Sequence, residues 1–546
     1  MRKRSLWEYI CISGLPWVPI LTAGGLLFVA SFNDLYGRYY VIDKYEIRFF
    51  LALSIFPTLM IFMKNMLWTR TPKKIGLFTW MNKFDYEPQN VSDRKFSALH
   101  PPIDDEYLSR TPDGLVLGKK GKDFVRVKLG KHNILNTIIM GSSGTGKSVL
   151  LITYLLYQLH KAPAPATVFA LDIKPELACK SVVINGNKKV HVMNPDDRLS
   201  YGWDVYYRLS SSSTDDEVLR ELGLICRALI DVGKAEKNAF FYTSAQRIMM
   251  GVLFFTWKLG RTFIQGILYL MDGSISDVIN NTLAAVEGKV EYKVVKRLLS
   301  PYQSKKSDAF ADIEMTMQES LGIFTEQNIQ FFFDINPRKA SPLDLENKTS
   351  VFFALNENEI DNYKVLLRLI TMQVMDHCIR RSEDSHMLTL IIDEAYKLGA
   401  INWTSFLSTS RSRQVATILA FQSLSQMQAV WGKDDARSLI ELCRVIAVLS
   451  CADSETAQML SSWCGEYMEE NHSVNHKGEA TKSYASKKIL QHADIMTLQD
   501  QHEAVLFIKG KYFRTNVMGA RYYKIKDLNI ISEKCKRINE QEVQSS

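Results

Sequence analysis

A glycine-rich stretch at residues 141–148 has the residue types and the spacing of a phosphate-binding loop. The pattern G-x-x-x-x-G-K-[ST] is met by Gly141, Ser142, Ser143, Gly144, Thr145, Gly146, Lys147 and Ser148. Glycines allow successive backbone N–H groups to turn inward around the phosphates, where Lys147 would neutralise charge and Ser148 would bind Mg²⁺. The sequence therefore predicts a nucleotide site.

A Mg²⁺ ion held on phosphate also needs a carboxylate at the end of a neighbouring strand. Two apolar runs end in such a group: residues 167–172 end in Asp172, and residues 387–393 end in Asp393 with Glu394 directly after it. An adjacent Asp–Glu pair can divide the labour, since Asp393 would hold the metal while Glu394 polarises the attacking water. Asp393 and Glu394 are therefore the predicted pair, and the alternative for Asp172 is a strand-end cap.

Hydrolysis also benefits from a polar group that orients water and from a cation near the γ-phosphate. The apolar run 415–421 delivers Gln422 at its carboxyl end, the side on which ligands lie in open α/β sheets. Gln422 is predicted to sense the γ-phosphate rather than to be a structural amide. Arg411 and Arg413 precede this run, and either could be an arginine finger supplied by a neighbouring subunit. A solvated helix end is the alternative for both arginines.

Short apolar runs that have the pattern of buried strands alternate with longer helical stretches beyond residue 130. The runs cover residues 134–140, 167–172, 350–355, 387–393, 415–421, 444–450 and 503–509. This alternation predicts an α/β fold with a mostly parallel sheet. The phosphate-binding loop follows the first run and precedes helical residues 149–160, which is the strand–loop–helix context that such a loop requires.

Residues 214–335 break this rhythm, because only helical periodicity is found there. Residues 214–217 resemble a capping box, and residues 239–259 form a long, mostly apolar stretch. Arg247 lies at the middle of that stretch, where a charge would be costly in a membrane. We therefore predict a buried helix of an all-helical insertion rather than a membrane span. Further along, the polar residues 470–486 are predicted to form a loop.

Two apolar runs near the amino terminus predict a membrane anchor. Residues 15–32 are uncharged and long enough to span a bilayer, and residues 49–63 form a second run. The outer flanks are basic, so the positive-inside rule places both ends of the anchor in the cytoplasm. A signal peptide is disfavoured because no small-residue cleavage site closes the first run. A buried hairpin of a soluble protein is the alternative.

The net positive charge of this chain is explained more by the flanks of the predicted membrane anchor than by a nucleic-acid-binding surface. The 546 residues include 67 Lys and Arg and 59 Asp and Glu, which give +8. Residues 1–74 hold ten basic and four acidic side chains and so carry +6, which leaves +2 for residues 75–546. A near-neutral bulk offers no global basic field. Contact with DNA would depend on local features, for which the candidates are Lys119, Lys120, Lys122 and residues 509–514.

The order of these features resembles the VirD4/TraD/TrwB-type coupling proteins of type IV secretion and conjugation, within the FtsK/HerA-like P-loop ATPases. Beside the two amino-terminal runs, the matching segments are GSSGTGKS (141–148), DIKPEL (172–177), IIDEAYKLG (391–399) and SRSRQVATILAFQSLSQMQAVWG (410–432). The chain departs from the family pattern at Pro175, where Gly is usual, and at Asp204-Val205, where Asn-Pro-Leu is usual. Neither departure touches a phosphate-binding position.

The resemblance implies a RecA-like ATPase that uses ATP and Mg²⁺ and forms a homohexamer. It would be a multi-pass protein of the bacterial inner membrane with most of its chain in the cytoplasm. The implied partners are relaxase-bound single-stranded DNA or protein effectors, the secretion channel and other secretion ATPases. By position, Arg411 matches the family's finger arginine better than Arg413. The roles of Asp172, Lys174 and Glu176 stay open.

Six parts are predicted along the chain. They are a membrane anchor (1–70), a linker (71–112), a first part of the nucleotide-binding domain (113–213), an all-α insertion (214–340), a second part of the nucleotide-binding domain (341–525) and a charged tail (526–546). Three alternatives to this function remain open. An FtsK-like DNA translocase would end in a winged-helix module, for which the tail leaves little room. A receptor for protein effectors only, and a nucleotide-binding scaffold without catalysis, are the others.

Overall fold

A computed structural model describes most of the chain between residues 103 and 516. The described residues are 103–111, 113–130, 133–142, 144–148, 150–151, 167–173, 176–185, 190–232, 239–303, 308–451, 453–474, 480–498 and 503–516. The chain divides into two compact units, and all described residues belong to the second, Asn90–Ser546. Both predicted membrane runs and the charged tail lie outside the described residues. Within those residues, no helix combines the length and the apolar character that crossing a membrane requires.

A twelve-stranded sheet runs through the described part of this unit, in the order β1-β3-β2-β16-β15-β12-β4-β11-β10-β5-β9-β6. Its parallel part consists of β12 (Val445–Val448), β4 (Thr137–Met140), β11 (Val415–Phe421), β10 (Leu388–Ile392), β5 (Thr167–Ile173), β9 (Ser350–Leu355) and β6 (Val190–Met193). The predicted α/β fold with a mostly parallel sheet is confirmed. Six of the seven predicted runs form strands in this parallel part.

The remaining strands extend the sheet in antiparallel fashion beyond β12. They are β15 (Glu503–Ile508), which is the seventh predicted run, β16 (Lys511–Asn516), β2 (Leu115–Lys120), β3 (Asp123–Val127) and β1 (Leu108–Ser109). Gly121 makes the turn between β2 and β3 with a φ of +63°, a conformation that glycine adopts without strain.

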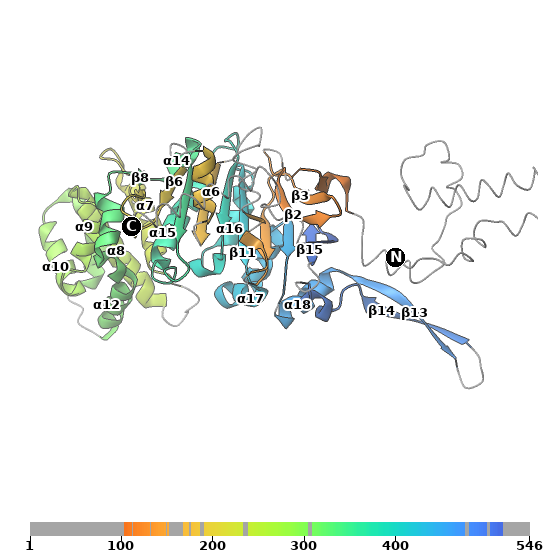
Figure 1. Ribbon diagram of the computed structural model, residues 1–546. Helices are drawn as coiled ribbons and strands as arrows, with labels where there is room; N and C mark the ends of the chain where they lie inside the picture. The colour runs from red at the N-terminus through yellow and green to blue at the C-terminus, as the bar shows by residue number, and fades with distance from the viewer. Residues whose placement is uncertain are drawn as a thin grey trace, which may run out of the picture. The chain divides into compact units, whose positions relative to one another are not determined.

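Both faces of the parallel strands are covered by apolar cores. Along β5, Phe169 and Leu171 pack into one core, whereas Val168 and Ala170 pack into the other. The helices α6 (Glu176–Asn185), α14 (Pro342–Glu346), α15 (Lys364–Ile379), α16 (Trp403–Ser410), α17 (Leu424–Leu442), α18 (Ser454–Trp463) and α19 (His492–Met496) accompany the strands (Figure 1). Strands covered on both faces read as continuous apolar runs, which is why the sequence revealed them.

Helices fill the chain between β7 (Gly202–Trp203) and β8 (Lys339–Ala340), two short strands that pair in parallel. The longer helices there are α7 (Asp215–Leu229), α8 (Ala239–Lys258), α9 (Phe263–Leu270), α10 (Ile275–Ala285), α11 (Lys293–Leu299) and α12 (Asp308–Leu321). Helix α8 packs against each of the other five (Figure 1). As predicted, the apolar stretch 239–259 is a buried helix, and residues Thr214 and Glu217 form the predicted capping box.

The prediction of a loop at residues 470–486 is wrong. Strands β13 (Glu466–Val474) and β14 (Ala480–Lys488) pair antiparallel in a separate two-stranded ribbon (Figure 1). Met468 and Tyr484 of this ribbon are exposed. Because these side chains are not covered by a core, the ribbon needs no alternation of apolar and polar residues, and periodicity gives no strand signal.

Candidate nucleotide-binding site

The predicted site residues follow neighbouring parallel strands at one edge of the sheet. Gly141 follows β4, Gln422 follows β11, Asp393 follows β10, and Asp172 lies near the end of β5. These four strands are consecutive in the sheet and run in the same direction, so their carboxyl ends meet at one edge. The N–H of Gly141 donates to the carbonyl of Phe421 at 3.0 Å, which joins the ends of β4 and β11 directly.

The loop after β4 closes around its own lysine. The Lys147 ammonium donates to the carbonyl oxygens of Gly141 at 2.5 Å and Ser142 at 3.3 Å, and Lys147 is only 8% exposed. Gly144 and Gly146 have φ values of +80° and +102°, which glycine adopts freely and other residues rarely do. The lysine charge therefore lies inside the loop, where a phosphate group would be surrounded by backbone N–H groups.

The helix that follows the loop begins at the lysine. Residues 147–148 and 150–151 are helical, and the N–H of Leu150 donates to the carbonyl of Gly146 at 3.2 Å. Ser148 is exposed in this first turn, so its hydroxyl is open to a metal ion. The amino end of a helix also favours an anion through its partial positive charge. Ser143 and most of the predicted helix 149–160 lie outside the described residues.

Ser450 supports the loop from the strand on its other side, and sequence reasoning missed it. It follows β12, which pairs with β4. Its hydroxyl accepts the N–H of Ser142 at 2.8 Å and lies 2.7 Å from the Ser142 hydroxyl. Finding this residue requires knowing that β12 and β4 are neighbours, which no local pattern reveals.

Replacing Ser450 by Ala is expected to weaken nucleotide binding about tenfold, because the Ser142 N–H would lose its partner at a cost of about 1.4 kcal/mol. The dissociation constant of a fluorescent ATP analogue measures this effect. Ser462→Ala, on an exposed part of α18, is the matched control. An unchanged dissociation constant for Ser450→Ala would show that Ser142 is held in place without this hydroxyl.

Glu394 and Gln422 are brought together by adjacent strands. The Gln422 amide donates to Oε1 of Glu394 at 3.4 Å, and the Tyr396 hydroxyl donates to Oε2 at 3.4 Å. Gln426 in turn donates its amide to Oε1 of Gln422 at 3.1 Å. The carboxylate and the amide therefore occupy one hydrogen-bonded cluster, in which Gln426 orients Gln422. A change in the position of either group would be transmitted to the other.

The backbone and the surroundings of Glu394 are unusual. Its φ is +53°, in the left-handed region where a residue with a side chain is strained, and such strain gathers at functional sites. Burial, followed by the charge of Glu394, raises the pKa of Tyr396 to about 12. Tyr396 therefore keeps its proton near neutral pH, and its hydroxyl can donate a hydrogen bond to Glu394. Tyr396 and Gln426 were also missed, because their roles depend on contacts rather than on spacing.

The Asp172 carboxylate contacts the start of the helix that follows its strand. The carboxylate accepts the N–H of Ala178 at 2.7 Å, in the first turns of α6, and the Asp172 side chain is buried. Burial is the main cause that raises its pKa to about 7; the backbone donors oppose this shift and the nearby charge of Asp393 adds to it. This contact supports the interpretation of Asp172 as a strand-end cap. Lys174 and the side chain of Glu176 lie outside the described residues.

The raised pKa of Asp172 predicts a pH-dependent stability. Between about pH 4 and pH 7, Asp172 is protonated in the folded protein and ionised in the unfolded chain, so its stabilising contribution is lost as the pH rises through about 7. Asp172→Asn mimics the neutral group at every pH. Without nucleotide or Mg²⁺, the melting temperature of this variant should therefore rise relative to wild type from pH 5 to pH 8. Asp312→Asn, exposed on α12, should show no such trend, and a parallel course of wild type and Asp172→Asn would contradict the prediction.

The two candidate arginines lie at the opposite end of β11 from the loop. Arg411 caps the carboxyl end of α16 and is exposed. Arg413 is half-buried and lies 3.9 Å from Glu383, and its carbonyl accepts from Arg381 at 3.1 Å. The seven residues of β11 separate them from Gln422 by about 20 Å. Neither arginine can reach the loop of its own chain, and Arg411 is the more exposed of the two.

These residues fit a Mg²⁺–nucleotide complex. The donors at the loop and at the strand ends are the Ser148 hydroxyl and the Asp393 carboxylate, which are oxygen ligands of the kind that Mg²⁺ takes. Across the described parts of the chain, no group of three or more His, Cys, Asp and Glu side chains could hold a metal ion. Mg²⁺ needs no such cage, because it is usually held by one or two protein groups and by phosphate oxygens.

Comparison with known sequences finds relatives in type IV secretion. Residues 387–500 match a family described as the TraM recognition site of TraD and TraG. The type IV secretion system-coupling protein VirD4 of Bartonella quintana is 22% identical over 385 residues, which are 64% of this chain and 57% of that protein. VirD4 of Bartonella henselae is 21% identical over 360 residues, which are 60% of this chain and 53% of that protein. The chain thus matches little more than half the length of these relatives.

Comparison with solved structures supports the same fold. The bacterial conjugative coupling protein TrwBdeltaN70, in an unbound form, has a TM-score of 0.57 and 18% identity, covering 70% of this chain and 84% of that chain. The plasmid coupling protein TrwB in complex with ADP and Mg²⁺ has a TM-score of 0.56 and 17% identity, with coverage of 70% and 84%. Because the sequence identity is so low, this structural likeness establishes the fold alone.

Proposed function

This chain is similar in sequence and in fold to the VirD4/TraD/TrwB-type coupling proteins, and from that similarity we propose that it is a membrane-anchored ATPase that brings substrates to a type IV secretion channel. The observation that carries the proposal is the arrangement at the sheet edge. There, Lys147 lies inside the loop after β4, and Glu394 is hydrogen-bonded to Gln422 at the ends of the next two strands.

Each residue of this edge has a role in the proposed reaction. The loop N–H groups and Lys147 bind and orient the phosphates, and Ser148 and Asp393 hold Mg²⁺, which neutralises phosphate charge when bound. Glu394 accepts a proton from the attacking water, and Gln422 positions that carboxylate and responds to the γ-phosphate. Arg411 acts on the nucleotide of the adjacent subunit in a homohexamer.

The proposed anchor consists of residues 15–32 and 49–63 in the bacterial inner membrane, with the bulk of the chain in the cytoplasm. The charge of +6 on residues 1–74 supports this orientation. Removal of residues 1–70 should release the protein from the membrane fraction. Retention of the truncated chain in washed membranes would contradict the anchor.

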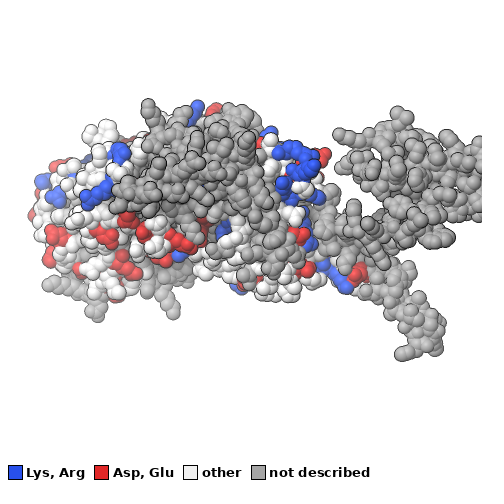
Figure 2. All heavy atoms as spheres, viewed as in Figure 1, with Lys and Arg blue, Asp and Glu red and all other residues white. Residues whose placement is uncertain are grey.

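The proposed substrate is relaxase-bound single-stranded DNA. Lys119, Lys120 and Lys122 lie in the β2–β3 hairpin, where they offer a local site for phosphates. Basic side chains gather on the surface over β2 and β3 (Figure 2). The other predicted basic segment, residues 509–514, is less suited. Lys511 pairs with Asp104 and Arg514 pairs with Glu503, so their charges are compensated.

The test is ATP hydrolysis by the purified full-length protein, with and without single-stranded DNA, together with its mass in solution. We expect hydrolysis that rises with DNA and a mass of six copies. Nucleotide binding without turnover would contradict the proposed ATPase activity and favour a non-catalytic scaffold.

A receptor for protein effectors only is the second candidate, and the net charge of +2 on residues 75–546 favours it. Hydrolysis that ignores DNA would point to this receptor. Crosslinking in cells distinguishes the two candidates, because a DNA carrier would be captured with relaxase and DNA, and a receptor with an effector.

A further inference from the structure

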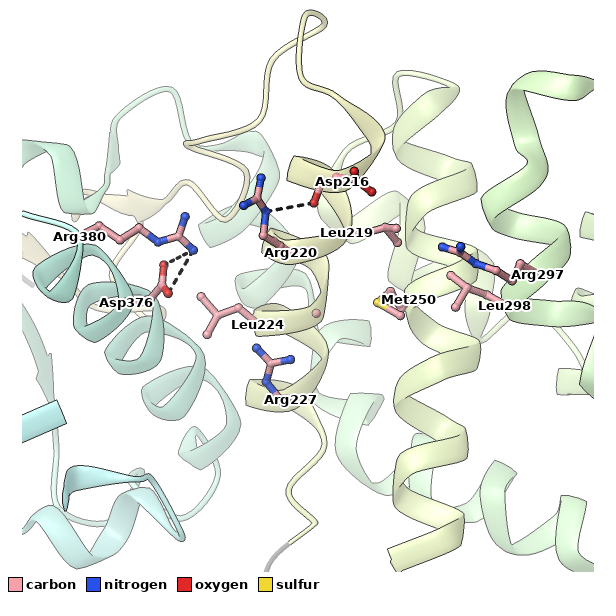
Figure 3. A pocket seen from close by; sticks show the side chains of 11 residues that line it. Asp216, Leu219, Arg220, Leu224, Arg227, Met250, Arg297, Leu298, Asp376 and Arg380 are labelled. Atoms are coloured by element: carbon pink, nitrogen blue, oxygen red, sulfur yellow. Dashed lines mark hydrogen bonds and ion pairs between the residues drawn. The ribbon is translucent and has the colours of Figure 1, made fainter. Parts of the chain in front are cut away.

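A groove of about 690 Å³ opens between helices of the inserted region and α15. It lies across α7, with α15 on one side and α8 and α11 on the other (Figure 3). None of its lining residues belongs to the nucleotide site described above. The groove is therefore a separate feature that the proposed reaction does not explain.

The floor of the groove is apolar. It is lined by Leu219 and Leu224 of α7, Met250 of α8 and Leu298 of α11 (Figure 3). Gly223 of α7 leaves the space between them open, since a Cβ added there would meet only the Met250 sulfur at 3.9 Å and the Arg227 guanidinium at 3.4 Å. Apolar side chains of a ligand could enter this space.

The rim of the groove is basic. It carries four arginines and two aspartates, a surplus of positive charge. Arg380 is compensated, because it lies 2.9 Å from Asp376 and 3.2 Å from Glu221. Arg227 and Arg297 form no ion pair with any carboxylate among the residues that the structure describes. Two guanidinium groups thus stand over an apolar floor without an internal counter-charge.

We propose that this groove binds an acidic, amphipathic segment of a partner protein. Arginine side chains pair with carboxylates through two parallel hydrogen bonds, and an apolar floor accepts the apolar face of a helix. A polynucleotide fits less well, since none of the eleven lining residues is aromatic and bases would have nothing to stack on. This inference goes beyond the proposed function, because such a segment would dock whether or not ATP is hydrolysed.

The test measures binding of a fluorescein-labelled peptide of Glu, Leu and Ala, designed as an amphipathic helix, to the full-length protein in detergent. The double variant Arg227→Glu with Arg297→Glu should bind it about tenfold more weakly, since it replaces attraction by repulsion. Gly223→Leu fills the floor without altering charge and should cause a similar loss. Lys433→Glu with Arg437→Glu, exposed on α17, is the matched charge control and should bind normally.

Four results would overturn the proposal. They are absence of saturable binding to wild type, equal affinity of the groove variants and wild type, equal affinity for a peptide with Gln in place of Glu, and binding of oligo(dT) that competes with the peptide and is lost in the same variants. The last result would assign the groove to nucleic acid. ATP turnover measured on the same preparations keeps the two proposals apart, because its absence in wild type defeats the ATPase and leaves the groove untouched.

Discussion

Glu394→Gln is expected to lower ATP hydrolysis about a thousandfold while nucleotide affinity stays within about threefold of wild type. The substitution keeps the size of the side chain but removes the group that takes a proton from water. In the wild-type protein, the Glu394 carboxylate accepts hydrogen bonds from Gln422 and Tyr396, not from the loop residues that would contact phosphate. Steady-state phosphate release and titration with a fluorescent ATP analogue measure the two effects separately.

Two further variants serve as comparisons for Glu394→Gln. Asp393→Asn should lower the rate of ATP hydrolysis and should also make nucleotide binding less dependent on Mg²⁺, because Asp393 is the proposed metal ligand. Glu441→Gln, exposed on α17, is the matched control and should hydrolyse ATP as wild type does. Full turnover by Glu394→Gln would remove Glu394 from the reaction and leave the observed cluster with Gln422 as a structural feature.

The parts of the site that sequence predicted are those whose signal is local. The loop at 141–148 is recognisable from eight consecutive residues, because its glycines and its lysine act on the same few phosphate oxygens. Asp393 and Glu394 were recognisable because they end an apolar run. Strands buried on both faces, such as β9, likewise need only consecutive apolar residues to be seen.

The parts that sequence did not predict depend on which strands become neighbours. Gln426 is an exception, because it contacts Gln422 only four residues away and no motif marks that contact. Ser450, however, reaches the loop only because β12 pairs with β4. The same reason hid the ribbon of β13 and β14, whose strands pair with each other and leave Met468 and Tyr484 exposed. Long-range pairing leaves no periodic trace in a single sequence when neither face is buried.

As the proposed finger arginine, Arg411 would have to act on the nucleotide of a neighbouring subunit. Strand β11 delivers Gln422 to the loop at one end and begins beside Arg411 at the other, so one strand separates the two functions within a subunit. An exposed arginine at that end can act only on the nucleotide of another copy, and a closed ring of identical subunits gives every copy such a neighbour. Oligomerisation would then be a condition of turnover.

Lys147→Ala and Arg411→Ala should each lower ATP hydrolysis about a thousandfold, and mixing the two inactive proteins should restore it. In mixed rings, a site with an intact lysine from one subunit can meet an intact arginine from its neighbour. Random mixing of equal amounts would give such a junction in about a quarter of the interfaces, and so about a quarter of the wild-type rate if the sites act independently. Phosphate release after co-expression or subunit exchange measures this recovery.

The control for that recovery follows from the same geometry. Lys147 and Glu394 serve the nucleotide of one subunit, so mixing Lys147→Ala with Glu394→Gln leaves no complete site at any junction and should restore nothing. Mixing Arg411→Ala with Glu394→Gln should restore turnover, because those two defects lie in different subunits of each junction. Recovery with the first mixture, or none with the second, would mean that Arg411 does not act across the interface. Arg413→Ala should hydrolyse ATP as wild type does without any partner, because its side chain lies near Glu383 and its carbonyl, which accepts from Arg381, is unchanged by the substitution.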